Sequence, residues 1–144
     1  MTKSDDAVHC FRDGFTCSST VFSTFSEGMG IDPDTAKKCS CGFGAGISKT
    51  GNICGAVSGA ILVIGPNYGK TKPGNDAATE KTRGLVREFI REFSARHGSV
   101  NCRNSSGITL PIRQNMNRHV RAVSSSRSVR NSLAMPLRFS KKIL

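Results

Sequence analysis

The chain contains no long hydrophobic run, no tryptophan and a single tyrosine. Its longest apolar stretch, residues 55–65, is far shorter than the roughly 20 residues that a membrane-spanning helix needs. Asp5 and Asp6 stand where the apolar part of a signal peptide would begin. We therefore expect a soluble, cytoplasmic protein without a membrane span.

Acidic residues are missing from the C-terminal part of the chain. Residues 103–144 hold nine Lys/Arg and no Asp or Glu, whereas residues 1–102 hold 12 Lys/Arg and 10 Asp/Glu. Most of the net charge of +11 thus belongs to a basic, Ser/Arg-rich tail at 104–144, which we expect to be disordered beside a domain at 1–103. A nucleic-acid-binding arm is the alternative, but Pro111 and Pro136 interrupt the periodicity that a groove-reading helix needs.

Six cysteines are present without a Cys-x-x-Cys or Cys-x-x-Cys-His motif. The second absence argues against covalent haem, and the first removes the usual signature of a thiol–disulfide oxidoreductase. Structural disulfides are rare in the cytosol, so the cysteines indicate metal binding or thiol chemistry. Cys39 and Cys41 form a close pair, which is a weak metal signal without a second pair.

The remaining pattern is that of an all-α protein, a small bundle of four or five helices joined by glycine-rich turns. No segment alternates strictly as a half-buried strand does, although the β-branched run at 61–64 is a candidate for a buried strand. Cap residues and apolar spacing predict helices at 5–12, 17 to about 27, 33 to about 40, 54–65 and 76 to about 97.

Cys54 opens the most apolar of these helices, and small residues such as Gly55 and Gly59 allow another backbone to approach it closely. Cys17 also lies in the first turn of a predicted helix, and Cys102 follows the turn at Gly98. Unpaired N–H groups and the dipole at a helix start favour a thiolate over a thiol. Spacing alone leaves two alternatives open, a joint site and three separate buried cysteines.

The glycine run GFGAG at 42–46 is a weak phosphate-binding signal. A dinucleotide loop follows a strand and leads directly into a helix, whereas a short polar helix is predicted before this run, and no Lys-Ser or Lys-Thr pair follows the run at P-loop spacing. A flexible loop that permits close backbone approach is the better interpretation.

Five segments, in this order, resemble the C_GCAxxG_C_C family of redox-active proteins: GFTC (14–17), GFGAG (42–46), CGAVSG (54–59), GPNYG (65–69) and NCR (101–103). The resemblance covers about residues 7–103, and a related domain occurs in split-Soret cytochromes. It implies a small helical domain with four characteristic cysteines that hold an iron–sulfur cluster or another redox group. It supplies a class and no reaction, so enzymatic activity stays open.

Cys17, Cys54 and Cys102 match three of the four family cysteines. The fourth belongs in a Cys-Pro segment near the C-terminus, and no cysteine follows Cys102. Residues 103–107 can be encoded so that the frame one nucleotide earlier reads Glu-Leu-Leu-Gly, the family's usual continuation. The same frame permits Cys-Pro-Lys-Leu from residues 128–132 and an acidic amphipathic helix from residues 133–140. We therefore hypothesise that residues 104–144 are a frameshifted translation.

We expect the cysteines that match the family to converge in one pocket as metal or redox ligands, with Cys41 as a substitute for the missing one and Cys10 and Cys39 as bystanders. An electron-transfer or sensing protein with an iron–sulfur cluster is the first function class. A thiol–disulfide oxidoreductase is the second, and a nucleic-acid-binding protein, through the tail, is the third. The redox partner protein is unknown. The expected lining residues are Gly42, Gly44, Gly46, Gly55 and Gly59.

Overall fold

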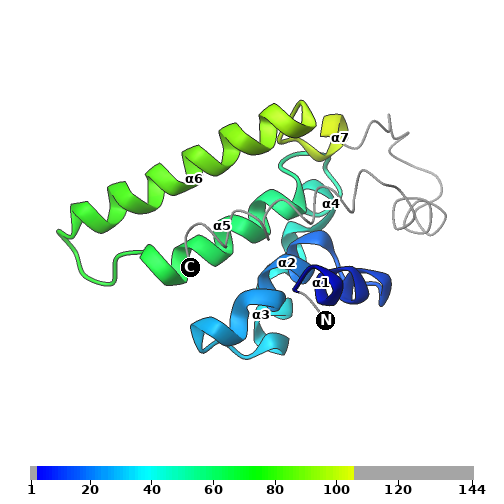
Figure 1. Ribbon diagram of the computed structural model, residues 1–144, viewed down its shortest axis with the longest axis horizontal. Helices are drawn as coiled ribbons and strands as arrows, with labels where there is room; N and C mark the ends of the chain where they lie inside the picture. Colours follow the sequence, from blue (N-terminus) through cyan, green and yellow to red (C-terminus); the bar gives the residue numbers. More distant parts are fainter. Residues whose placement is uncertain (1–2, 106–144) are drawn as a thin grey trace.

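The computed structural model describes residues 3–105, and these are almost entirely helical (Figure 1). The predicted tail at 104–144 lies almost wholly outside the described residues. Five helices have eight or more residues, in agreement with the all-α prediction. Two single turns, α4 and α7, and two 3₁₀ turns, η1 and η2, connect or follow them. The elements are α1 (Lys3–Arg12), α2 (Cys17–Ser26), η1 (Glu27–Met29), α3 (Pro33–Ser40), η2 (Cys41–Phe43), α4 (Gly44–Ile47), α5 (Gly55–Tyr68), α6 (Asp76–His97) and α7 (Cys102–Ser105).

Side-chain caps fix the starts of three helices where the sequence predicts them. Thr16, Asp32 and Asn75 each accept a hydrogen bond from the backbone N–H three residues further on. Pro33 occupies the first position of α3, where its missing N–H costs nothing. Gly98 ends α6 in the left-handed conformation, with φ of 78°.

Helix α5 runs further than predicted. The sequence places its end at Gly65-Pro66, but the helix continues to Tyr68. Proline lacks the N–H that a helix interior uses, yet the last turn still closes. The Asn67 side-chain amide donates to the Val63 carbonyl at 2.8 Å, and the Gly69 N–H donates to the Gly65 carbonyl at 2.7 Å. Residues 61–64 are therefore helical and not a strand.

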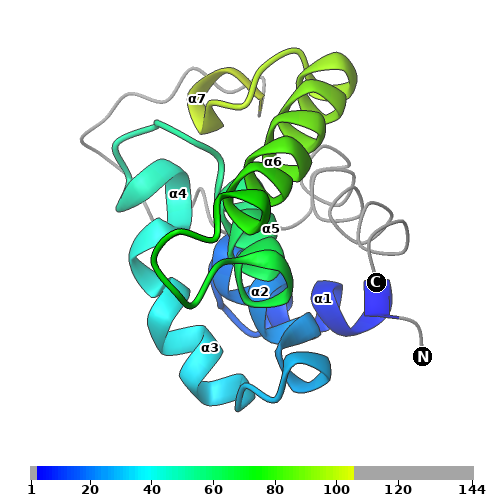
Figure 2. The same ribbon diagram turned by 90° about the vertical axis from the view of Figure 1, so that its left-hand side faces the viewer.

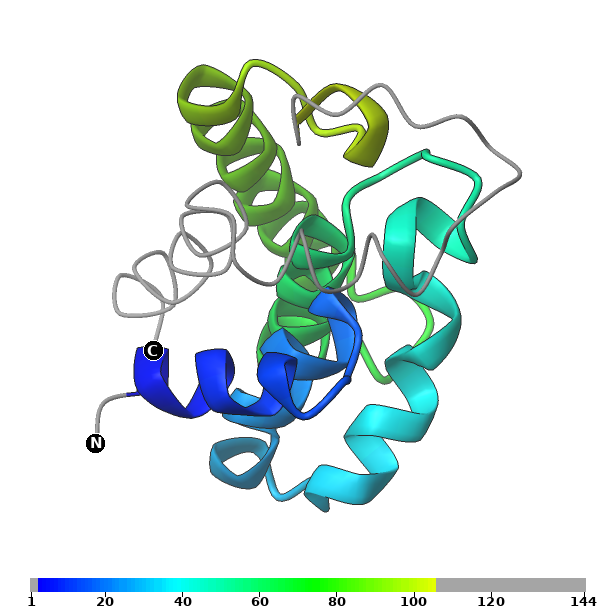
Figure 3. The same cartoon turned by 90° about the vertical axis from the view of Figure 1, so that its right-hand side faces the viewer.

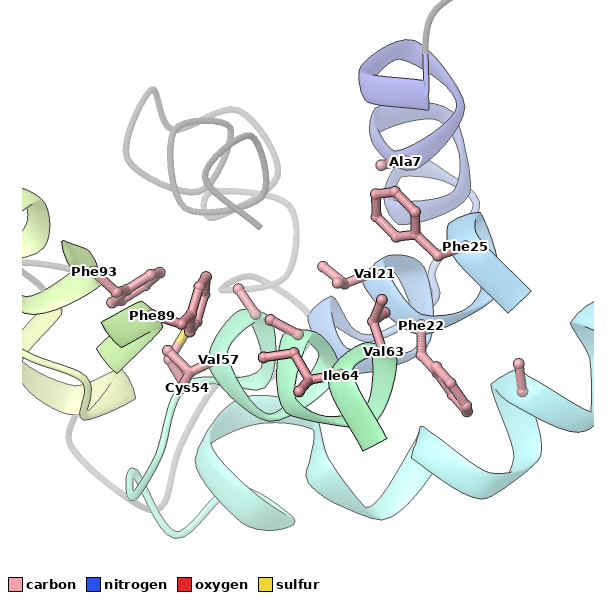
Figure 4. Close-up of a cluster of buried hydrophobic side chains, with 13 residues drawn as sticks. Ala7, Val21, Phe22, Phe25, Cys54, Val57, Val63, Ile64, Phe89 and Phe93 are labelled. Atoms are coloured by element: carbon pink, nitrogen blue, oxygen red, sulfur yellow. The ribbon is translucent and has the colours of Figure 1, made fainter. Parts of the chain in front are cut away.

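Helix α5 lies at the centre of the domain, between α6 and α2, with α1 and α3 against α2 (Figures 2 and 3). The described residues contain no strand, and one isolated antiparallel bridge joins Ile53 to Asn101. A search of the described helices finds none that is long and apolar enough to cross a membrane. The buried side chains of α2, α5 and α6 form one cluster (Figure 4), which includes Val21, Phe22, Phe25, Val57, Val63, Ile64, Phe89 and Phe93.

Close contact between α2 and α5 depends on Gly59. A Cβ at Gly59 would lie 2.9 Å from the Val21 Cβ and 3.0 Å from the Ser18 carbonyl oxygen. Neither neighbour is the flexible end of a long side chain, so the helices would have to separate.

We predict that Gly59→Ala lowers the free energy of unfolding by about 1–3 kcal/mol, measured by urea denaturation. The matched control is Gly84→Ala in α6, where an added Cβ meets no atom within 4 Å. That variant is expected to be more stable by up to about 1 kcal/mol, because alanine favours a helix. Equal effects of the two variants would contradict the close packing of α2 on α5.

Candidate functional site

Cys54 and Cys102 are brought together by a short backbone pairing between segments far apart in the chain. The Cys54 N–H donates to the Val100 carbonyl at 2.8 Å, and the Cys102 N–H donates to the Asn52 carbonyl at 2.7 Å. These two bonds place the start of α5 beside the start of α7. A hydrogen bond between the two thiols follows from this arrangement.

Cys17 reaches the same place through the contact of α2 with α5. It is the first residue of α2, and Cys54 is the N-cap residue of α5. A Cβ on Gly55 would lie 3.1 Å from the Cys17 Cβ, so the backbone next to Cys54 lies against Cys17. Repulsion from an ionised Cys54 raises the pKa of Cys17, and repulsion from ionised Cys54 and Cys17 raises the pKa of Cys102. We call Cys17, Cys54 and Cys102 the three-thiol cluster.

The cluster is shielded from water to different degrees. Cys54 is buried, and Figure 4 places it at the α6 end of the apolar core, beside Phe89. Cys17 and Cys102 are partly buried, and all three cysteines are free. The site therefore joins the apolar interior to the surface at one end of the domain.

Burial and repulsion from neighbouring thiolates keep Cys17 and Cys102 protonated. Burial, followed by the charge of Cys54, raises the pKa of Cys17 from 9.0 to about 12, against the opposing effect of a backbone N–H. The pKa of Cys102 is also raised, first by its hydrogen bond with Cys54, then by burial and by the charges of Cys54 and Cys17. The prediction that a helix start favours the thiolate is therefore wrong for Cys17.

The raised pKa of Cys17 predicts a loss of stability in alkali. A thiol whose pKa is higher in the folded than in the unfolded state stabilises the fold below the unfolded pKa, and this stabilisation is lost as the pH rises through the folded value. We expect the free energy of unfolding to fall between about pH 9 and pH 12. Urea denaturation at several pH values measures it, and Cys17→Ser should reduce the slope. An unchanged slope in that variant would contradict the assignment.

A left-handed turn holds the loop at 45–49 against the cluster. All five residues have positive φ, including Ala45 at 53° and Ile47 at 60°, which costs a residue with a side chain roughly 1–2 kcal/mol. The Ser48 N–H donates to the Gly42 carbonyl at 2.9 Å, and Gly46 accepts from the Asn52 N–H at 3.0 Å. The sequence predicts a flexible loop here, whereas the structure has a strained turn fixed at both ends.

The glycines predicted to line the site have different roles. Gly46 contacts Cys102, since a Cβ there would lie 2.8 Å from the Cys102 Cβ, and Gly55 contacts Cys17. Gly44 makes room for the Thr16 side chain next to Cys17. Gly59 serves the packing of α2 on α5, and an added Cβ on Gly42 would meet no atom within 4 Å.

The other three cysteines have different surroundings from those of the cluster. Cys39 and Cys41 are exposed, and Cys10 is partly buried with its Sγ 4.0 Å from the Ser23 Oγ. Among residues 3–105, no group of three or more His, Cys, Asp or Glu side chains is placed to hold a metal ion. The predicted role of Cys17, Cys54 and Cys102 as ligands, and of Cys41 as a substitute, stays a prediction.

Comparison with known proteins gives one family. The model of the family described as "Putative redox-active protein (C_GCAxxG_C_C)" matches residues 15–130, a span that includes the three-thiol cluster and continues past Arg103. Neither the curated proteins nor the solved structures contain a significant match.

Proposed function

Because the chain belongs to the C_GCAxxG_C_C family of redox-active proteins, we propose that its redox group is held by the three-thiol cluster. The observation that carries this proposal is the convergence of cysteines from positions 17, 54 and 102, through the hydrogen bond of Cys54 with Cys102, the contact of Gly55 with Cys17 and the charge interactions among the three. A protein core has no need to place three thiols where their ionised forms repel one another.

An iron–sulfur cluster is the redox group that the donor set favours. Thiolates are the protein ligands of iron–sulfur clusters, and a metal replaces the protons that burial and repulsion hold on these thiols. Binding requires the sulfurs to move toward a common centre, since they are not placed to hold a metal ion as they stand. When bound, such a cluster supplies one-electron transfer, which suits an electron carrier or a redox sensor.

The family resemblance implies four cysteine ligands, so a fourth must join the three-thiol cluster. Cys41 is the candidate in this chain, because its η2 turn leads into the loop that contacts Thr16, next to Cys17, through Gly44 and contacts Cys102 through Gly46. Without a fourth thiolate, we expect the cluster to be bound weakly and to be sensitive to oxygen.

A disulfide between Cys54 and Cys102 is the second candidate, favoured by the hydrogen bond between their thiols. Forming it removes two electrons and two protons, which an oxidising partner disulfide would accept to become a dithiol. The raised pKa of Cys102 opposes rapid chemistry, because the thiolate is the reactive form. Nucleic-acid binding through the tail rests on residues outside the described part of the chain.

Anaerobic reconstitution separates the two candidates. The reduced protein is incubated with ferrous iron, with and without sulfide, and the visible spectrum and the iron content are measured after desalting. Sulfide-dependent visible bands with bound iron support the cluster. A reversible Cys54–Cys102 disulfide in metal-free protein, without such bands, supports the thiol–disulfide reaction. If the protein shows neither sulfide-dependent bands nor a reversible disulfide, the proposal is overturned.

We also propose that residues 104–144 are read in a shifted frame, because a frame that restores a Cys-Pro segment would supply the missing fourth cysteine. The family match continues to residue 130, although the frameshift hypothesis by itself predicts no match after Arg103. The encoding DNA decides whether the tail is read in a shifted frame. Codons at residues 128–132 that cannot yield a cysteine in the shifted frame would rule the hypothesis out.

A further inference from the structure

Exposed hydrophobic side chains surround the three-thiol cluster. In the described part of the chain, the large hydrophobic residues with the highest exposure are Phe15 (39%), Ile53 (39%) and Phe43 (36%). Phe15 lies two residues before Cys17, and Ile53 lies immediately before Cys54. The carbonyl oxygen of Phe43 would lie 3.4 Å from a Cβ on Gly55, beside Cys54. Each of the three hydrophobic residues is therefore close, in sequence or in space, to a residue of the three-thiol cluster.

The loop between η2 and α5 connects these side chains across one end of the domain. At one side Gly44 contacts Thr16, which follows Phe15. At the other side Gly46 contacts Cys102, and a Cβ added to Gly51 would lie 3.0 Å from the Arg103 Nε. The turns α4 and α7 lie next to each other at this end (Figures 2 and 3). Phe15, Phe43 and Ile53 thus border one site rather than three unrelated places.

Positive charges accompany them. Lys37 Nζ lies 4.7 Å from the centre of the Phe15 ring, although it also pairs with Asp34 at 3.2 Å. Lys49 is exposed in the strained turn, and the Arg103 guanidinium donates to the Thr50 carbonyl at 3.3 Å. No Asp or Glu occurs between residues 35 and 75, a stretch with five lysines. This acid-free segment supplies the loop that borders the cluster.

We propose that these exposed hydrophobic and positively charged residues form a rim around the three-thiol cluster. This rim is the docking surface for an acidic redox protein that exchanges electrons with the redox group held by the thiols. Apolar side chains release water on contact, and a positive rim attracts a negatively charged partner and orients it. Small, charge-steered interfaces are typical of transient electron-transfer complexes. The proposal rests on the proposed function, and it names the partner's chemistry. The rim consists of Phe15, Lys37, Phe43, Lys49, Ile53 and Arg103.

Binding of an acidic plant-type ferredoxin, used as a probe, tests the rim in the full-length reduced protein without iron. The rim variant reverses three charges, K37E/K49E/R103E, and the control reverses three exposed charges elsewhere, K72E/K81E/R91E. The basic tail is present in both variants and contributes equally. Circular dichroism verifies that both variants fold.

The rim variant is expected to bind the ferredoxin about tenfold more weakly at low salt, and the control within about twofold of the original. F43S/I53S should weaken binding at high salt as well, since its loss is apolar. Equal weakening by both charge variants, or no ferredoxin binding at low salt, would overturn the proposal. Because binding is measured without iron, a failed reconstitution leaves this result readable.

Discussion

Alanine in place of Gly46 is expected to lower the free energy of unfolding by about 2–4 kcal/mol. Gly46 has φ of 70°, and its added Cβ would lie 2.8 Å from the Asn52 nitrogen, the Gly51 carbonyl carbon and the Cys102 Cβ. Two of these neighbours are backbone atoms, and they are held by the pairing that aligns Cys102 with Cys54. The substitution should therefore strain the turn and move Cys102 away from Cys54.

The control for Gly46→Ala is Gly42→Ala in the same loop, where an added Cβ meets no atom within 4 Å. Urea denaturation measures stability, and the rate of Cys54–Cys102 disulfide formation under a mild oxidant reports how close the two sulfurs lie. We expect both quantities to fall in Gly46→Ala and to change little in Gly42→Ala. Unaltered disulfide formation in a destabilised Gly46→Ala protein would show that the turn does not position Cys102.

Alanine in place of Cys54 is expected to lower the pKa values of both remaining cluster thiols. Cys54 raises the pKa of Cys102 by a hydrogen bond and by its charge, and it raises the pKa of Cys17 by its charge. Burial of Cys17 and Cys102 persists in the variant, so their pKa values should fall only part of the way toward ordinary thiols. Iron loading should be lost, because one of the three proposed ligands is removed.

Alkylation rates at a series of pH values, with the modified peptides identified by mass spectrometry, measure both pKa values in one experiment. Cys10→Ala is the matched control, since the Cys10 thiol contacts the Ser23 hydroxyl, with its Sγ 4.0 Å from the Ser23 Oγ. If the rate profile of Cys102 is the same in Cys54→Ala as in the original protein, the two thiols do not interact as the structure indicates.

The helices could be predicted because their signals are local. Asp32 followed by Pro33, Asn75 before α6 and Gly98 after it each act within one helical turn, and all mark observed boundaries. The predicted end of α5 at Pro66 was wrong, because the prediction considered the missing N–H of the proline without the groups that compensate for it. The Asn67 side chain and the Gly69 N–H satisfy carbonyls of the last turn, so α5 continues past the proline.

The arrangement of the site depends on contacts that no local pattern encodes. Ala45, Ile47, Ser48 and Lys49 rarely adopt positive φ, so their sequence carried no signal for a left-handed turn. The pairing of residue 52 with residue 102 is likewise a long-range contact. Spacing left joint and separate cysteines equally open, and only the family resemblance favoured a joint site.

The pKa of Cys17 could be predicted only in its local contribution, that of the helix start. The start of α2 does lower the pKa of Cys17 through a backbone N–H, as the helix argument requires. Burial and the charge of Cys54 act more strongly in the opposite direction. These depend on the packing of α2 against α5, which the sequence suggested through Gly55 and Gly59 without giving its depth.

The central claim is that Cys17, Cys54 and Cys102 together hold the redox group, and a pair of cysteine variants tests it most directly. C17S/C54S/C102S removes the three-thiol cluster, C10S/C39S removes two of the other cysteines and keeps Cys41, and both are reconstituted anaerobically beside the original protein. The account predicts that sulfide-dependent bound iron is lost in the first variant and retained, at least in large part, in the second. Equal iron loading in the two variants would contradict it.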